Sequence, residues 1–231
     1  MNKFIDNIDC HHCKLGCVNF MKPSESELDL LLSSKRTICY KKSETIFKQS
    51  TFVSHVAFIR SGLVKIFTEG FNDKNIIIQF IAKNNFIGLP FIFNDNYSYY
   101  TATALTNTEL CLIEKNEFSK LILNNLVLEK YILKLISNDA GILCDKVSSL
   151  GTKQLHGCLA SAILNLSKGD FRDENIFSHL TKRELAEYAG MSVESLMRLL
   201  SELKSDKIII QKGKEIIIND YNLLEKLSLV G

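Results

Sequence analysis

The chain has 231 residues, of which 46% are hydrophobic and 23% are charged, as is typical of a soluble globular protein with one large domain or two smaller ones. No apolar run reaches the length of a membrane-spanning helix, and Met1–Asp9 lacks the apolar stretch of a signal peptide. We therefore expect a cytoplasmic protein with no membrane partner. The formal net charge of +2 is too small to indicate a nucleic-acid partner by itself.

The seven cysteines are unevenly distributed, because three of them crowd into a short N-terminal segment. Cys10 and Cys13 are separated by two residues, and Cys13 and Cys17 by three. A reducing cytoplasm argues against a disulfide framework, so clustered cysteines indicate metal binding or redox chemistry. Residues 1–23 are therefore expected to form a separate cysteine-rich N-terminal segment.

Residues 24–124 are expected to form an antiparallel β-roll or sandwich that follows one short helix. Ser24 and Glu27 have the spacing of a capping box, which predicts a helix over about 25–33. From about 37 to 115 the chain contains short apolar stretches rich in β-branched and aromatic residues, separated by Gly, Asn and Asp turn residues. Strands are expected at Val56–Ile59, Leu63–Phe67, Ile76–Ile81 and Leu110–Ile113, and Phe86–Phe93 is read as a further strand.

Helical periodicity begins near residue 116, and residues 125–150 are expected to form one long helix. Apolar residues recur there at spacings of three and four, which places them in a narrow stripe on one face. Such a stripe can pack on the chain's own sheet or form the seam of a dimer, and its narrowness favours the dimer. The expected dimer interface consists of Ile132, Ile136, Ala140, Leu143, Val147 and Leu150. Gly151 is expected to end this helix before a further helix over about 152–168.

Residues 151–231 are expected to form a winged helix-turn-helix. Thr181 can cap a first helix, and Ser192 can cap a second one. Gly190, between them, lies where a left-handed turn residue is expected. The buried face of the second helix is expected to contain Leu196, Leu199, Leu200 and Leu203. After this helix, isoleucines on both sides of a basic turn predict a β-hairpin, which would be the wing.

The opposite face of the second helix carries side chains suited to reading DNA. Glu194 and Arg198 lie one turn apart, which is also the spacing of an ordinary surface ion pair. A glutamate can accept a hydrogen bond from cytosine N4 and an arginine can donate two to guanine, so their position in the first turns of this helix favours base recognition. Lys212 and Lys214 at the wing tip would either meet phosphates or remain solvated. The expected DNA-binding residues are Ser192, Glu194, Ser195, Met197, Arg198, Lys212 and Lys214.

A family resemblance rests on the order of β-roll, long helix and winged helix-turn-helix, and on the segments Phe58–Lys65 and Val193–Arg198. In these features the sequence resembles the Crp/Fnr family of bacterial regulators along nearly its whole length. The resemblance implies an α+β protein with a cyclic-nucleotide-binding-like N-terminal domain. Such a protein regulates transcription as a homodimer on palindromic promoter DNA, with RNA polymerase as a partner. By resemblance, Glu194 and Arg198 read a G·C pair in each half-site. Met197 departs from the Fnr branch, which has a serine there, and its apolar side chain can instead contact a thymine methyl group.

The resemblance also implies which signal the N-terminal domain detects. The cyclic-AMP branch holds its nucleotide with a Gly-Glu pair and an Arg-Ser pair. The corresponding segments, Phe86–Phe91 and Tyr100–Ala102, contain neither glutamate nor arginine, so we expect no cyclic-AMP binding. The Fnr branch instead carries an oxygen-sensitive iron–sulfur cluster on four cysteines, which implies a [4Fe–4S] redox sensor here. The matching cysteines are Cys10, Cys13, Cys17 and Cys111.

Other signals remain open on the residues alone. His11 and His12 lie within the cysteine cluster, so zinc with mixed ligands is one alternative. Cys111 can also be a small buried side chain on a strand. Thiol oxidation, haem, nitric oxide or a small apolar effector in the roll would then supply the signal. An enzyme is not expected, because the chain shows no nucleophile–base pair, no phosphate-binding glycine loop and no paired carboxylates.

Overall fold

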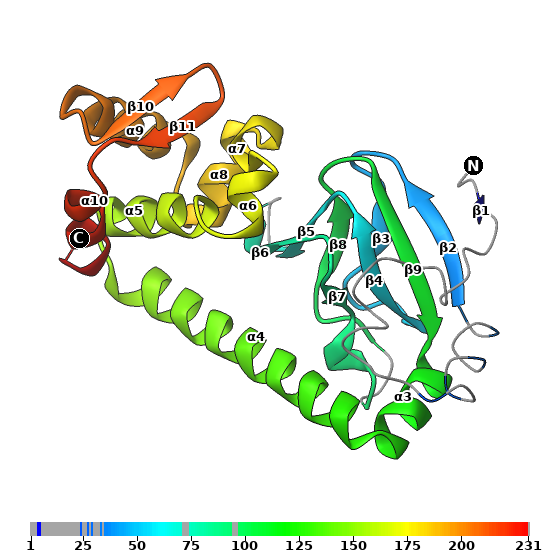
Figure 1. The fold of residues 1–231 in the computed structure, drawn as a ribbon. Helices are drawn as coiled ribbons and strands as arrows, with labels where there is room; N and C mark the ends of the chain where they lie inside the picture. Colours follow the sequence, from blue (N-terminus) through cyan, green and yellow to red (C-terminus); the bar gives the residue numbers. More distant parts are fainter. Residues whose placement is uncertain are drawn as a thin grey trace. The chain divides into compact units, whose positions relative to one another are not determined.

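The computed structural model describes residues 4–5, 24, 27, 29, 33, 35–70, 74–93 and 97–230. These residues belong to two compact units, and one of the points where the chain passes between the units lies within a long helix (Figure 1). One unit comprises the described residues of Met1–Thr68 and Phe80–Gly141, and the other those of Glu69–Gln79 and Ile142–Gly231. None of the described helices is long and apolar enough to cross a membrane.

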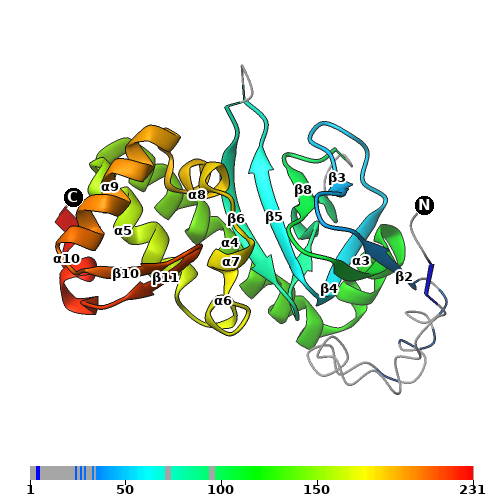
Figure 2. The same cartoon turned by 90° about the horizontal axis from the view of Figure 1, so that it is seen from above.

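A β-roll of two antiparallel sheets occupies the N-terminal half of the chain, as the sequence predicted (Figure 2). One sheet has the strand order β1-β2-β9-β4-β7, and the other has the order β3-β8-β5-β6. Strands form here because β-branched and aromatic residues are frequent and turn residues separate the short apolar stretches. The strands are β1 Phe4–Ile5, β2 Lys35–Tyr40, β3 Thr45–Phe47, β4 His55–Ser61, β5 Leu63–Thr68, β6 Ile76–Ala82, β7 Phe86–Ile87, β8 Thr101–Ala104 and β9 Thr108–Glu114.

Four of the five strands expected from the sequence are confirmed to within two residues, as β4, β5, β6 and β9. The fifth prediction is wrong, because Phe86–Phe93 does not form one strand. Strand β7 ends at Ile87, Gly88 has a left-handed φ of 90°, and the 3₁₀ helix η3 spans Leu89–Phe91. A glycine tolerates this φ and Pro90 favours the first turn of a helix, so the two residues together interrupt the extended backbone.

The helical region after β9 consists of two helices, α3 Lys115–Asn124 and α4 Leu126–Thr152. Asn125 separates them, and its side-chain oxygen accepts hydrogen bonds from the N–H groups of Val127 and Leu128 at 3.1 and 3.0 Å. Asn125 therefore caps α4, which begins one residue after the predicted start. The helix continues through Gly151, contrary to the predicted break there.

The C-terminal half of the chain contains short helices and a two-stranded hairpin, and it has the predicted winged helix-turn-helix arrangement. The further helix expected near 152–168 is α5, and eight of its residues are buried. The hairpin pairs Ile209 with Ile218 and Lys212 with Glu215. The elements are α5 Leu155–Leu166, α6 Asp170–Asp173, α7 Ile176–His179, α8 Lys182–Ala189, α9 Val193–Ser205, β10 Ile209–Lys212, β11 Glu215–Ile218 and α10 Tyr221–Val230.

One buried cluster connects the roll to the start of α4. Phe58 of β4 and Cys111 of β9 lie opposite each other in the sheet, and both belong to this cluster. Leu128 and Ile132 of α4 pack into the same cluster and are 0% and 1% exposed. Burial against the chain's own sheet therefore holds this part of α4.

This burial corrects the predicted dimer interface at one position. Ile132 belongs to the core of its own chain, and Ile136 is half-buried against the same cluster. The other four predicted residues, Ala140, Leu143, Val147 and Leu150, are exposed. Leu126 and Leu133 are also exposed and lie at intervals of seven residues from Ala140, which is the repeat of a coiled-coil seam.

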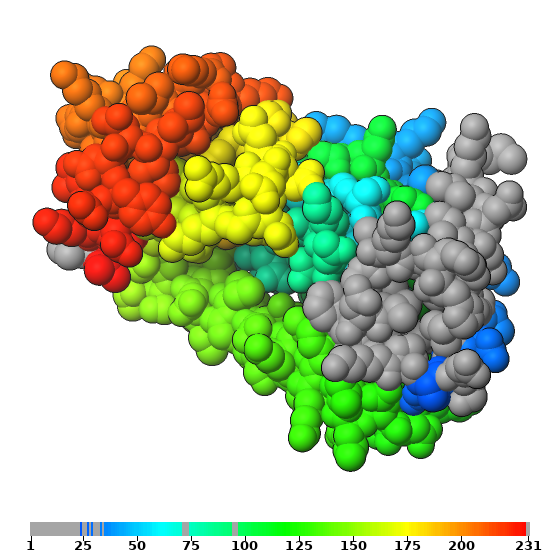
Figure 3. All heavy atoms as spheres, in the orientation of Figure 1, coloured from blue at the N-terminus to red at the C-terminus, as the bar shows by residue number. Residues whose placement is uncertain are grey.

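One apolar stripe on α4, the α4 seam, has side chains that are exposed or half-buried. Its members share two heptad positions on one face of the helix. Atoms of α4, drawn in green, form part of the visible surface in Figure 3. The α4 seam consists of Leu126, Leu133, Ile136, Ala140, Leu143, Val147 and Leu150.

Candidate nucleic-acid interface and sensor site

Two capped helices and the turn between them form the helix-turn-helix. Thr181 accepts a hydrogen bond from the Glu184 N–H at 3.1 Å, and the Glu184 carboxylate accepts one from the Thr181 N–H at 2.9 Å. This reciprocal pair is the predicted capping box of α8. Gly190 ends α8 with a left-handed φ of 72°, and Ser192 begins α9 by accepting a hydrogen bond from the Ser195 N–H at 3.1 Å. All three sequence predictions about this motif are confirmed.

Helix α9 has one buried face and one exposed face. The buried leucines are Leu196, Leu199, Leu200 and Leu203, each at most 3% exposed. They lie on the side of α9 that contacts α5 and α8. Because that side is occupied, Glu194, Met197 and Arg198 point away from the unit and are exposed. The N-terminal turns of α9 therefore present the side chains that the sequence assigned to base recognition.

The two charged residues of this face are not engaged with each other. Among the residues that the structure describes, Glu194 and Arg198 form no ion pair with one another. Hydrogen bonds from its own backbone N–H and from the Ser192 side chain lower the pKa of Glu194. The carboxylate is thus ionised at neutral pH and can accept a hydrogen bond, while the Arg198 guanidinium can donate.

The wing is the hairpin of β10 and β11, and its tip carries both predicted lysines. Lys212 and Lys214 are exposed on either side of Gly213. The side-chain amide of Gln211 donates to the Gly213 carbonyl at 3.2 Å, which ties the strand to its turn. The wing tip therefore adds two cations to the unit that also carries α9, where they can contact phosphates.

Several contacts that the sequence analysis did not identify hold the helix-turn-helix in place. The Lys146 ammonium at the end of α4 donates to the Tyr188 carbonyl of α8 and lies 4.3 Å from the centre of the Tyr188 ring. Burial lowers the pKa of Lys146 to about 8. His156 of α5 and Glu202 of α9 are joined by a hydrogen bond of 2.9 Å between Nε2 and Oε2. These partners lie 42 and 46 positions apart, so no local pattern indicates them.

The two segments that the sequence analysis compared with the nucleotide-binding segments of the cyclic-AMP branch, Phe86–Phe91 and Tyr100–Ala102, contact each other. The buried Tyr100 hydroxyl accepts a hydrogen bond from the Gly88 N–H at 3.0 Å. The Tyr100 ring packs on the Phe91 ring, with the two ring centroids 5.0 Å apart. Leu89, two residues before Phe91, is also buried. Burial raises the pKa of Tyr100, so its hydroxyl stays protonated. The backbone donor at Gly88 is therefore satisfied from within the chain.

Of the four cysteines predicted to bind a cluster, the structure describes one, Cys111. Three of the cysteines and the two histidines between them lie outside the described residues; these are Cys10, Cys13, Cys17, His11 and His12. Cys111 lies on β9, is 6% exposed, and belongs to the buried cluster that contains Phe58. Within the described ranges, no three His, Cys, Asp or Glu side chains are grouped closely enough to hold a metal ion.

A β-roll, a long helix and a winged helix-turn-helix with a solvent-facing second helix define a DNA-binding transcriptional regulator. Comparisons with protein families agree, because residues 37–125 match the cyclic nucleotide-binding domain and residues 159–227 match the Crp-like helix-turn-helix domain. The chain belongs to the Crp/Fnr family of transcriptional regulators. It is a regulator and not an enzyme, as the sequence predicted.

Known relatives match the chain over almost all of its length. Electron transport regulator A of Shewanella oneidensis is 28% identical over 229 residues, which cover 96% of this chain and 90% of that protein. The fumarate and nitrate reduction regulatory protein of Vibrio cholerae is 28% identical over 228 residues, covering 94% and 90%. The structure of FixK2 from Bradyrhizobium japonicum has a TM-score of 0.75 at 17% identity and covers 85% of this chain and 98% of that one. The structural match confirms the predicted fold.

Replacing Gly190 with alanine should destabilise the helix-turn-helix by about 1–3 kcal/mol. An alanine would need the left-handed φ of this position, and its Cβ would clash with the Leu150 side chain. Urea unfolding followed by circular dichroism measures the free energy. Gly151→Ala is the matched control, because a Cβ there meets nothing within 4 Å and Gly151 lies in a helix. Equal losses of stability in the two variants would contradict this account of the turn.

Proposed function

We propose that the chain binds palindromic promoter DNA as a homodimer, and that its N-terminal part adjusts this binding to redox state through a [4Fe–4S] cluster. The observation that carries the DNA-binding mode is the exposed start of α9, where Glu194 and Arg198 lie one turn apart above a buried leucine face. RNA polymerase remains a predicted partner. The proposed DNA contacts are Ser192, Glu194, Ser195, Met197, Arg198, Lys212 and Lys214.

Each proposed contact follows from the chemistry of its side chain. The Arg198 guanidinium would donate two hydrogen bonds to guanine O6 and N7, and the ionised Glu194 would accept one from cytosine N4. Met197 is 48% exposed and apolar, which suits a thymine methyl group. Lys212 and Lys214 would contact phosphates, which increases affinity without reading sequence.

Replacing Arg198 with alanine should weaken binding to the preferred site by about 1–3 kcal/mol and relax the preference for guanine at one position. Lys212→Ala should instead weaken binding to all sequences by a similar factor, because a phosphate contact is present at every site. Fluorescence anisotropy with matched and singly substituted duplexes measures both effects. An Arg198→Ala protein with unchanged base preference would disprove the assigned role.

The α4 seam is the proposed dimer contact. It offers apolar side chains at the two heptad positions that pair in parallel helices, and these side chains are exposed or half-buried within the single chain. Leu133 is 57% and Val147 is 70% exposed, so both would lose apolar surface to water on pairing. A dimer would place its two α9 helices about one DNA turn apart, about 34 Å, for binding to a palindrome.

Two adjacent residues of α4 allow a matched test of this interface. Leu133→Ala should weaken dimerisation about tenfold to a hundredfold, because each of the two copies loses a buried leucine. Ile132→Ala should instead lower the free energy of unfolding by about 2–5 kcal/mol, because it leaves a cavity in the roll. Sedimentation equilibrium measures the first effect, and urea unfolding at a fixed protein concentration measures the second. If the two substitutions weaken the dimer equally, the proposed seam is wrong.

The donor set fits the proposed cluster. Four thiolates are the usual ligands of [4Fe–4S], and Cys10, Cys13 and Cys17 are spaced closely enough for one loop to supply three of them. Cys111 would supply the fourth from β9, in apolar surroundings that shield a bound cluster from water. When bound, the cluster would supply redox chemistry that responds to oxygen. Relatives named for electron transport and for fumarate and nitrate reduction support a redox signal.

The position of Cys111 also offers a route from the cluster to the dimer contact. Cys111 belongs to the same buried cluster as Leu128 and Ile132, which anchor the first turns of α4. Packed interiors transmit small displacements, because their side chains interdigitate without free space. A change in the position of the Cys111 thiol would therefore alter how α4 sits on its sheet, and with it the presentation of the α4 seam.

Protein purified without oxygen should contain about four iron atoms per chain and show broad visible absorption. Cys111→Ala should lose the iron and the absorption, because one thiolate ligand is missing. Cys158→Ala is the matched control, since Cys158 is equally buried but lies on α5. Iron and sulfide assays with an absorption spectrum provide the measurement. Full iron content in Cys111→Ala, or none in the wild type after anaerobic reconstitution, would exclude this cluster.

A further inference from the structure

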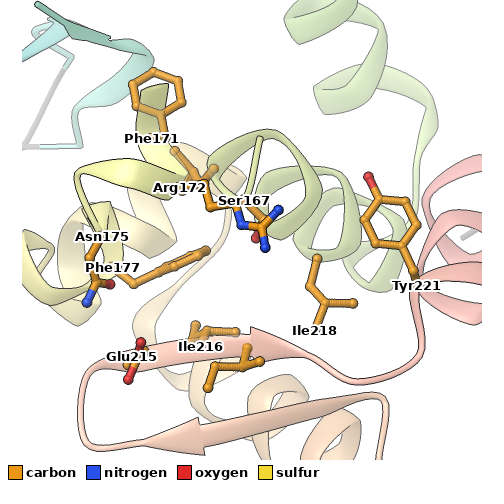
Figure 4. A pocket seen from close by; sticks show the side chains of 11 residues that line it. Ser167, Phe171, Arg172, Asn175, Phe177, Glu215, Ile216, Ile218 and Tyr221 are labelled. Atoms are coloured by element: carbon orange, nitrogen blue, oxygen red, sulfur yellow. The ribbon is translucent and has the colours of Figure 1, made fainter. Parts of the chain in front are cut away.

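A cavity of about 460 Å³ lies in the C-terminal unit, and none of its lining residues belongs to α9. Its walls come from the end of α5, the region of α6 and α7, strand β11 of the wing, and Tyr221 at the start of α10 (Figure 4). This volume is within the range of sites that hold small organic molecules. None of the residues that line this cavity is a proposed DNA contact or a proposed cluster ligand.

The floor of the cavity is apolar. Leu166, Phe177 and Ile216 line it and are 1%, 6% and 5% exposed, so they are held in place by packing. Phe171 and Tyr221 add aromatic rings at its edges. A ligand with an apolar body would therefore bury surface here without moving the core.

One cation faces this apolar floor. Figure 4 shows the Arg172 guanidinium extended into the middle of the cavity, between α5 and the wing strand. Among the described residues, this guanidinium makes no hydrogen bond and no ion pair. An arginine fork pairs most strongly with a carboxylate or a phosphate, which accepts two parallel hydrogen bonds.

The other polar groups limit the charge of a ligand. The Glu215 carboxylate also lines the cavity, at the end near Phe177 and Asn175 (Figure 4). A second negative charge on the ligand would approach this carboxylate and be repelled. The lining thus favours a molecule with one anionic group and an apolar remainder.

We propose that this cavity binds a small organic monocarboxylate, with its carboxylate on Arg172 and its apolar body against Phe177 and Ile216. Ile216 lies on β11, so a bound molecule would contact the strand that carries the wing. Occupancy would therefore restrain the wing from within the DNA-binding unit. The site shares no residue with the proposed iron–sulfur cluster, and its test does not depend on that proposal.

Calorimetric titration of the full chain with phenylacetate and with phenylacetamide, its neutral analogue of similar shape, tests the site. The wild type should bind phenylacetate about tenfold more tightly than the amide, as expected for a hydrogen bond to a charged group. Arg172→Met should abolish this preference. Lys168→Gln removes one nearby positive charge outside the lining and should keep the preference, which separates the specific contact from general charge.

The methyl groups of the isoleucines locate the bound molecule. In a protein labelled at isoleucine δ1 methyls, phenylacetate should shift the resonances of Ile216 and Ile218 by ring-current effects, and Arg172→Met should remove the shifts. Shifts confined to isoleucines of the β-roll would overturn the proposal. It would equally be overturned if the wild type bound neither phenylacetate nor hexanoate at about 10 mM, or if Arg172→Met bound both as tightly as the wild type.

Discussion

Burial of Leu128 and Ile132 in the core of the roll determines which side of α4 remains available for other contacts. A helix that commits one stripe to its own sheet can present only the remaining faces elsewhere, and here the exposed apolar stripe contains Leu133. The two stripes are one residue apart in sequence. A rearrangement of the core around Cys111 would therefore displace α4, the other side of which is apolar and exposed.

The far end of α4 is in direct contact with the helix-turn-helix. Leu150 lies against Gly190 in the turn, and the Lys146 ammonium binds the Tyr188 carbonyl near the C-terminal end of α8. A cation at this end of a helix is favoured by the helix dipole, although burial lowers the pKa of Lys146. Because Leu150 also belongs to the α4 seam, the residues that would pair two copies adjoin those that position the recognition motif.

Local features of this chain were predictable, and contacts between distant segments were not. The caps at Thr181 and Ser192 depend on residues within three positions, and the leucine face of α9 depends on a single helical period, so both were evident in the sequence. The periodicity of α4 could not distinguish Ile132 from Leu133, because two neighbouring apolar stripes share the helix and only the sheet decides which is covered. The cavity beside Arg172 depends on tertiary packing, which no motif encodes.

The hydrogen bond from the Gly88 N–H to the Tyr100 hydroxyl has a thermodynamic consequence for the β-roll. A free ligand stabilises the state that binds it in proportion to the logarithm of its concentration, whereas a side chain of the same polypeptide has no concentration to vary. Tyr100 is present at constant effective molarity in every folded copy. The packing of β7, η3 and β8 around this hydrogen bond is thus part of the intrinsic folding equilibrium, and no dissolved ligand is needed to occupy the Gly88 donor.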